Sequence, residues 1–214
     1  MGGIGQTRAD DDCSPYGGID GASDASLTDS LAYLDRVCAY AVEVGVGLVN
    51  GNGGYTPHGI TPEGRQVIAR RIGEGLAGYE LSLAARGLRL TLENHYGFQL
   101  QTPEDYAEVF AVVPDTGRIG MTVDTGHFSA AEVEMPLLIQ ALGPRVFHVH
   151  MKDHIGLQSV GLGQGQTDNA AVVSALNEVG YDGCISIELE VADKENEPRY
   201  IREALPYVER LLAG

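Results

Sequence analysis

The 214-residue sequence predicts an α/β fold in which helices cover a parallel sheet. The order of the segments is the first sign, because one helical segment is followed by strand and helix segments that alternate five times. The strand segments are also apolar at nearly every position, which is typical of strands covered on both faces. Nothing in the pattern marks a second domain. We therefore expect a flexible leader or loop at residues 1–26 and one domain at residues 27–214.

The first predicted helix follows the leader. Residues 1–26 are rich in glycine, aspartate and serine and show little periodicity. The segment SLAYLDRVCAYAVEVG at residues 30–45 has apolar residues at helical spacing and stops at Gly45, which can form the C-cap. VGLVNG at residues 46–51 then indicates a short buried strand. A glycine-rich loop leads from this strand to His58.

The second predicted helix has clear start and stop signals. Thr61 can cap its N-terminus, and Pro62 is tolerated at the first helical position. The helix should run to about Arg86, because Gly87 can end it. The segment LRLTLEN at residues 88–94 follows as the next strand.

The middle of the chain repeats these signals. Thr102, followed by proline and glutamate, starts a helix that we expect to reach about Val113. RIGMTVD at residues 118–124 is the third strand. A helix near residues 133–142 and the strand RVFHVHM at residues 145–151 complete this region.

The last elements follow a long loop. Asp168 can cap a helix at residues 169–179, which Gly180 ends. CISIELE at residues 184–190 is the fifth strand, and the last helix is expected at residues 197–212.

Composition and charge disfavour several classes of partner. The net charge is −16 at pH 7, so the surface repels nucleic acids and anionic membranes. No apolar segment has the length of a membrane span, and the first residues lack the apolar region of a signal peptide. The three cysteines are too few and too scattered for a disulfide framework or a thiolate metal site. We therefore expect a cytoplasmic protein with a small-molecule partner and neither nucleic-acid nor membrane partners.

Four successive predicted strands end in a polar side chain that could bind a metal. Ligand chemistry in parallel α/β folds lies at the carboxyl ends of the strands. These residues are Glu93, Asp124, His150 and Glu188. Each alone is more often a helix cap, a surface residue or a packed histidine, but four on consecutive strands are not expected by chance. Three carboxylates and one imidazole suit a divalent cation such as Mn²⁺, Mg²⁺ or Co²⁺, which would also relieve the crowding of like charges.

The sequence around these residues resembles a known family. The segments are LTLENHYGFQLQTPEDYAEVF, IGMTVDTGH, ALGPRVFHVHMKD and VGYDGCISIELE. Together they are similar to the sugar phosphate isomerase/epimerase superfamily, the xylose isomerase-like TIM barrel group. The resemblance covers about residues 30–212. It implies a TIM-barrel type (β/α) parallel barrel and a metal-dependent isomerase or epimerase.

The resemblance also implies roles for individual residues. The glutamate of E-x-H, the aspartate of D-T-x-H, the second histidine of H-x-H and the first glutamate of the last strand bind the metal in the family. They match Glu93, Asp124, His150 and Glu188. The residues expected to bind substrate are His95, His127, Lys152 and Asp153.

Other polar residues have simpler interpretations. We expect Glu190 to lie outside the ligand set or in solvent, and Asp168 to be a turn residue that caps a helix. His148 could orient a carboxylate or simply pack. His58 and His154 lie in predicted loops, either over the site or on the surface.

The sequence departs from the family pattern in two ways. Gln99 stands where ketose 3-epimerases usually have an acid, and no arginine follows His150 closely, so the motifs are closer to inosose dehydratases and uncharacterised isomerases. Only about five of the eight strands of a (β/α)₈ barrel are evident, and those expected first are missing. The barrel is therefore expected to be N-terminally incomplete. A truncated reading frame, a strand hidden in residues 1–26, or completion by a partner such as a second copy would each explain this.

The predicted chemistry is proton transfer next to a carbonyl group. Glu93 and Glu188 are the expected catalytic residues, because one could remove the α-proton of a sugar or polyol ketone and the other could return it. An enediolate would form between the two steps, and expulsion of a β-hydroxyl would give dehydration instead. An endonuclease IV-like nuclease is disfavoured by the six histidines and the negative charge. A non-catalytic truncated barrel or partner subunit remains an alternative.

Overall fold

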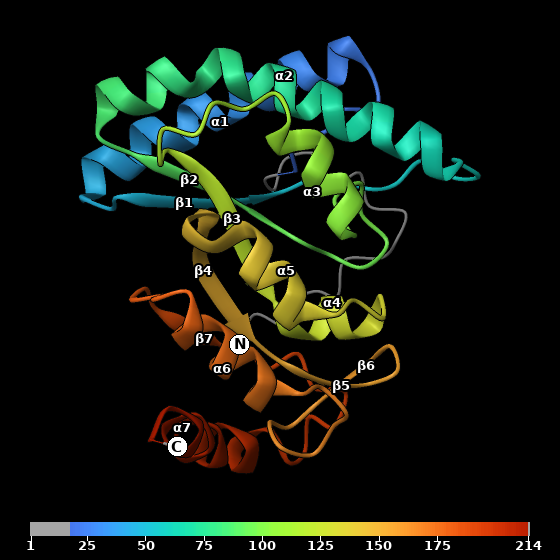
Figure 1. The fold of residues 1–214 in the computed structure, drawn as a ribbon, viewed down its shortest axis with the longest axis vertical. Coiled ribbons are helices and arrows are strands. Elements are labelled where there is room, and N and C mark those ends of the chain that lie inside the picture. The colour runs from blue at the N-terminus through green and yellow to red at the C-terminus, as the bar shows by residue number, and fades with distance from the viewer. Residues whose placement is uncertain (1–17, 214) are drawn as a thin grey trace.

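Five parallel strands form one sheet with the order β1-β2-β3-β4-β7. The computed structural model describes residues 18–213. The strands are β1 (Leu48–Asn52), β2 (Arg89–Glu93), β3 (Ile119–Asp124), β4 (Val146–Met151) and β7 (Ile185–Ile187). All neighbouring strands run parallel. The sheet is a half-barrel, so the predicted fold class of an incomplete (β/α) barrel is confirmed (Figure 1).

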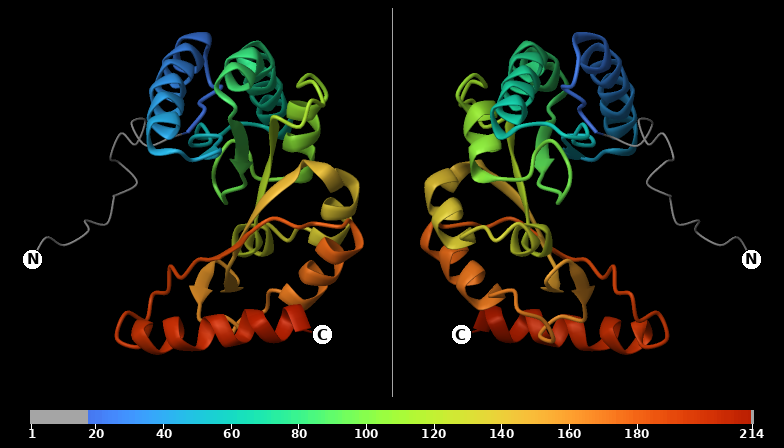
Figure 2. Two further views of the ribbon diagram at one scale, coloured as in Figure 1. Left: turned by 90° about the vertical axis from the view of Figure 1, so that its left-hand side faces the viewer. Right: turned by 90° about the vertical axis from the view of Figure 1, so that its right-hand side faces the viewer.

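The first helix precedes β1, and the other helices alternate with the strands of the sheet along the chain. The helices are α1 (Asp24–Val44), α2 (Pro62–Arg86), α3 (Pro103–Phe110), α5 (Met135–Leu142), α6 (Asn169–Glu178) and α7 (Glu197–Ala213). Figure 2 shows them along the outer side of the curved sheet. The predicted caps are present: Thr61 accepts a hydrogen bond from Gly64 N, and Gly45 and Gly87 end α1 and α2 in the left-handed conformation. Asp168 likewise caps α6 by accepting from Ala171 N, as predicted.

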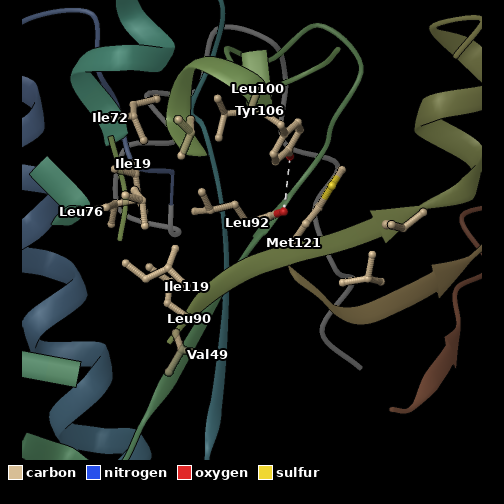
Figure 3. Close-up of a cluster of buried hydrophobic side chains, with 14 of the residues drawn as sticks. Ile19, Val49, Ile72, Leu76, Leu90, Leu92, Leu100, Tyr106, Ile119 and Met121 are labelled. Atoms are coloured by element: carbon tan, nitrogen blue, oxygen red, sulfur yellow. Dashed lines mark hydrogen bonds between the residues drawn. The ribbon is translucent and has the colours of Figure 1, made fainter. Parts of the chain in front are cut away.

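The two faces of the sheet differ in chemistry. Leu90, Leu92 and Met121 are fully buried in the main hydrophobic cluster beneath the helices (Figure 3). Thr91 and Thr122 belong to the opposite face, where their hydroxyl oxygens lie 2.9 Å apart. Because side chains alternate along a strand, apolar residues face the helices and polar residues face the inside of the half-barrel.

Most of the predicted leader lies outside the described residues. Of its described part, Ile19 is only 2% exposed and donates a backbone hydrogen bond to Asn52 O of β1. Gly18 forms an isolated parallel bridge with Asn52. Helix α1 starts at Asp24, within the span predicted as leader. Residues 18–23 are therefore a loop packed against the sheet, and the domain boundary at residue 26 stays a prediction.

Some elements were not predicted, and two of the predicted ones, α3 and β7, are markedly shorter than expected. The additional elements are helix α4 (Thr125–Ala130), the 3-10 turn η2 (Gly143–Arg145) and the hairpin of β5 (Asp153–Ile155) with β6 (Gln158–Val160). Helix α3 ends at Phe110 rather than near Val113. Strand β7 covers only three residues of the predicted 184–190 segment. No helix in the described part of the chain has the length and apolar character needed to cross a membrane.

Candidate metal centre

The four predicted ligands meet at one end of the sheet. Glu93 and Asp124 are the last residues of β2 and β3, His150 is near the end of β4, and Glu188 directly follows β7. One potential ligand atom of each residue lies within 4.8 Å of those of the other three. Parallel strands bring their carboxyl ends to the same edge, which explains why residues so far apart in the chain converge.

His150 is shared by two carboxylates. Its Nδ1 lies 2.6 Å from Glu93 Oε1 and 3.0 Å from Glu188 Oε2. One ring nitrogen carries at most one proton, so it can satisfy only one of the two carboxylates. The imidazole of His150 and the carboxylates of Glu93 and Glu188 therefore converge on one position, as the ligands of a single cation do.

Asp124 is held rigidly at the end of β3. Its side chain is fully buried, and its Oδ1 accepts a hydrogen bond from His127 N, which caps α4. The buried amide of Asn94 binds the Asp124 backbone on both sides: its Oδ1 accepts from Asp124 N, and its Nδ2 donates to Asp124 O. Because Oδ1 and the backbone are fixed, Oδ2 remains directed into the cluster.

The pKa values of the cluster reflect crowded charges. Burial raises the pKa of Asp124 to about 7, although Lys152 partly offsets it. Burial alone would raise the pKa of Glu188, but His150 and Lys152 outweigh it and lower the value to about 2. Burial likewise opposes the charge on His150, but hydrogen bonds with Glu188 and Glu93 raise its pKa to about 10. Such mutual shifts are typical of functional sites.

Lys152 lies inside this cluster rather than at its rim. Its side chain is 1% exposed, and Nζ lies 3.1 Å from both Asp124 Oδ2 and Glu188 Oε1. Glu190 Oε2, on a side chain that is 58% exposed, lies 2.8 Å from the same ammonium. These carboxylates outweigh the unfavourable burial and raise the pKa of Lys152. The ammonium therefore compensates negative charge in the centre, and the expected contact of Lys152 with substrate stays a prediction.

Two of the predicted substrate residues lie in a row of packed aromatic rings beside the candidate ligands. The rings of His95 and His127 lie 3.8 Å apart between centroids and are tilted by 34°, and Phe98 continues the row 3.9 Å from His95. Tyr55 packs on Phe98 at 4.4 Å. Burial and the charge of Lys152 lower the pKa of His127 to about 2, and burial lowers that of His95. Both imidazoles are therefore neutral near pH 7 and offer ring faces and single hydrogen bonds.

Asp153, by contrast, faces a loop. Its carboxylate accepts hydrogen bonds from the backbone amides of Gly163, Gly165 and Thr167. The carboxylate therefore organises residues 163–167, and the expected contact of Asp153 with substrate stays a prediction.

The remaining histidines, His148, His154 and His58, lie in three different environments. His148 Nε2 lies 2.9 Å from Ser186 Oγ, so its side chain packs in the layer below the ligands. His154 is 4% exposed rather than a surface loop residue, and its ring lies 5.9 Å from that of His127. His58 is exposed.

Two asparagines that contact the candidate ligands were not predicted from the sequence. Asn94 holds Asp124, as described above, and Asn50 Nδ2 donates to Glu93 Oε2 over 2.8 Å. A signal was present in each case. Asn50 interrupts the apolar strand VGLVNG, and Asn94 directly follows a ligand at a strand end.

The residues present fit a divalent cation. Asp124 Oδ2 and Glu188 Oε2 are buried acceptors without a hydrogen-bond partner among the described residues, although Lys152 and His150 lie near them. A buried acceptor without a partner is costly, and coordination to a cation would remove that cost. Glu93, Asp124, His150 and Glu188 would hold the ion through oxygen and imidazole atoms.

The sequence matches the profile of the xylose isomerase-like TIM barrel family over residues 13–211. The chain belongs to this family. The resemblance that its motifs carry is therefore confirmed. The half-barrel is the corresponding part of the family's fold.

Curated relatives match over part of their length. An uncharacterized protein of Methanocaldococcus jannaschii is 31% identical over 135 residues, which are 59% of this chain and 46% of that protein. An inosose dehydratase of Lactiplantibacillus plantarum is 28% identical over 159 residues, 62% of this chain and 53% of the relative. An L-ribulose 3-epimerase of Mesorhizobium japonicum is 33% identical over 107 residues, 49% and 35% respectively. The chain thus spans about half the length of the first two relatives and about a third of the last.

Solved structures show the same fold. An IolI protein crystallised with a zinc atom has a TM-score of 0.75 and 20% identity, with 89% of this chain and 72% of that chain covered. At this identity the likeness concerns the fold.

Proposed function

We propose that this chain carries the active site of a divalent-metal-dependent isomerase or epimerase that acts on a sugar or polyol ketone. The observation that carries the proposal is the convergence of Glu93, Asp124, His150 and Glu188 from four adjacent strands to within 4.8 Å. Membership of the family and the inosose and ribulose enzymes among the relatives support it. A bound divalent cation would supply Lewis-acid stabilisation of negative charge on the substrate oxygens.

The proposed catalytic residues flank the centre. Glu93 ends β2 and Glu188 follows β7, and these two strands lie on opposite sides of β4, which carries His150. The two carboxylates therefore approach His150 from opposite sides. One carboxylate removes the α-proton of the ketone and the other returns it, either to the opposite face or to the neighbouring carbon. His127 and His95 bind hydroxyl groups or stack on the carbon skeleton.

Electrostatics favour an uncharged substrate. Asp124, Glu188 and Glu190 surround the buried Lys152, so its ammonium is already paired. A phosphate or carboxylate on the substrate would meet this negative cluster at close range, in a protein of net charge −16. The proposed substrate is therefore a free sugar or a polyol ketone.

The proposal is tested by solvent exchange. The protein is incubated in D₂O with Mn²⁺, Mg²⁺, Co²⁺ or Zn²⁺ and a panel of ketoses and inososes, with hydroxypyruvate as an anionic comparison, and deuterium uptake at the α-carbon is followed by NMR. We expect metal-dependent deuterium uptake and product formation in the wild type, and Glu188→Gln should abolish product formation while metal remains bound. Product formation that is unchanged in Glu188→Gln excludes its acid–base role.

Dehydration is the second candidate. The inosose dehydratase relative matches 62% of this chain, and Gln99 stands where ketose 3-epimerases have an acid. Loss of a β-hydroxyl from the same enediolate would give an unsaturated product with strong ultraviolet absorbance. Appearance of that absorbance with an inosose, without a new epimer, would select the dehydratase.

A further inference from the structure

A chain of hydrogen bonds, the polar relay, joins Thr91, Thr122, Asn50 and Glu93 on the inner face of strands β1 to β3, directly below the candidate metal centre. Thr91 Oγ1 and Thr122 Oγ1 lie 2.9 Å apart, and Thr122 Oγ1 donates to Asn50 Oδ1 over 3.0 Å. Asn50 Nδ2 then donates to Glu93 Oε2 over 2.8 Å. Each of the three strands contributes a residue, and the relay ends on a proposed ligand.

The chemistry of the partners fixes the direction of every bond. The ionised carboxylate of Glu93 only accepts, so the amide nitrogen of Asn50 must face it. The amide oxygen of Asn50 consequently faces Thr122, which must donate. Thr122 has a single hydroxyl proton, so Thr91 is the donor in the remaining bond. The two threonines thereby hold the Asn50 amide with its nitrogen toward Glu93.

The relay determines which oxygen of Glu93 faces the cluster. Oε2 is occupied by Asn50, so Oε1 is the atom that lies 2.6 Å from His150 Nδ1. In the strand register, Asn52 is the residue opposite Glu93, but its side chain accepts from Gly54 N in the following loop. Asn50, two residues earlier on the same face, therefore supplies the contact.

We infer that Asn50, oriented by Thr122 and Thr91, is a positioning residue that fixes Glu93 for metal binding and proton transfer. The inference rests on the proposed metal centre. It gives a role in that centre to Asn50, which contacts a proposed ligand but would not touch the ion. Outer partners of metal ligands hold the ligand in its binding orientation, and their loss typically weakens metal binding about 10-fold to 100-fold. Asn50 is exposed on β1, so its substitution leaves the core intact.

The test measures Mn²⁺ affinity of the full chain by the electron paramagnetic resonance signal of free Mn²⁺, with thermal unfolding recorded in parallel. Asn50→Ala should weaken binding about tenfold. Thr122→Val, which replaces the hydroxyl with a methyl group, should weaken Mn²⁺ binding by a smaller factor. Thr122→Ser, which keeps the hydroxyl, should bind Mn²⁺ with wild-type affinity. Asn177→Ala, at an exposed asparagine of α6, is the matched control and should bind Mn²⁺ as the wild type does.

A double-mutant cycle shows whether Asn50 acts through Glu93. In a Glu93→Gln background the Asn50→Ala substitution should have no further effect on affinity, because the ligand it positions is gone. The same loss in both backgrounds, or wild-type affinity in Asn50→Ala, overturns the inference while leaving the metal centre standing. A wild-type protein that binds no Mn²⁺, or binds it independently of Glu93, overturns the metal centre and the inference together.

Discussion

At the scale of single residues, the ammonium of Lys152 compensates the charge of two carboxylates of the candidate centre. It lies within 3.1 Å of Asp124 and Glu188 oxygens and is almost completely buried. Removing one partner of a buried pair leaves an uncompensated charge, which costs about 3–5 kcal/mol. Lys152→Met should therefore lower the free energy of unfolding of the metal-free protein by about 3 kcal/mol, measured in urea.

Added Mn²⁺ should offset this loss. The cation supplies the missing positive charge, so it should raise the stability of Lys152→Met more than that of the wild type. Lys194→Met, at an exposed pair with Glu197, is the control and should change stability by less than about 0.5 kcal/mol. An equal effect of both substitutions would contradict the role given to Lys152.

His154 makes the stability depend on pH. Burial lowers the pKa of His154 below its ordinary value of 6.5, and Lys152 adds to the effect. The unfolded chain binds a proton near pH 6.5 but the folded chain does not, so stability falls as the pH drops below this value. His154→Gln should show a shallower loss of stability than the wild type between about pH 7 and pH 5.

The measurement is the urea midpoint at several pH values. His58→Asn, at an exposed histidine, should keep the slope of the wild type. A wild-type slope in His154→Gln would show that other groups carry the acid sensitivity.

At the scale of elements, strand ends were the most predictable feature. Apolar segments that stop at Glu93, Asp124 and His150 indicated both the strands and the ends at which the candidate ligands meet, because the carboxyl ends of parallel strands lie at the same edge. Capping residues such as Thr61 and Asp168 likewise carry their own stereochemical signal.

The unpredicted elements lack such local signals. Helix α4 has only six residues and starts directly after β3, so no apolar period can develop. The β5–β6 hairpin has strands of three residues and depends on Asp153, whose partners lie ten to fourteen residues away in the chain. The placement of Lys152 and Asp153, by contrast, follows from strand alternation. Lys152 lies two residues after His150 and points into the candidate centre, whereas Asp153 lies two residues after Met151 and faces a loop.

The hydrogen bonds of the Asp153 carboxylate should hold the loop at residues 163–167 in place. Asp153→Ala leaves the amides of Gly163, Gly165 and Thr167 without their acceptor, which should cost about 1–3 kcal/mol. Limited proteolysis should then cut within residues 161–167 faster than in the wild type. Asp168→Ala removes only the cap of α6 and should cost about 1 kcal/mol without faster cutting there. Identical proteolysis of both variants would contradict the assignment.

At the scale of the whole molecule, the net charge of −16 opposes the compact state. Surface repulsion is screened by salt, whereas the buried pairs of the centre are screened much less. The melting temperature should therefore rise between about 0.05 M and about 0.5 M NaCl. A melting temperature that is constant or falls over this range would show that repulsion does not limit stability.

The half-barrel has two edge strands, β1 and β7, among the described residues. Beyond β1 the described chain adds only the bridge of Gly18 to Asn52. Association with a second copy stays a prediction, which sedimentation of the full chain would test. The candidate metal centre lies at the ends of strands β2, β3, β4 and β7, so all four proposed ligands come from one chain.

The most direct measurement of the central claim is an anomalous difference map from crystals of the protein soaked in Mn²⁺. We predict one strong peak bound by Glu93, Asp124, His150 and Glu188, each with one atom at about 2.0–2.4 Å. The peak should disappear in crystals of Asp124→Asn. The absence of a peak among these four side chains, with Mn²⁺ bound elsewhere or not at all, would contradict the account.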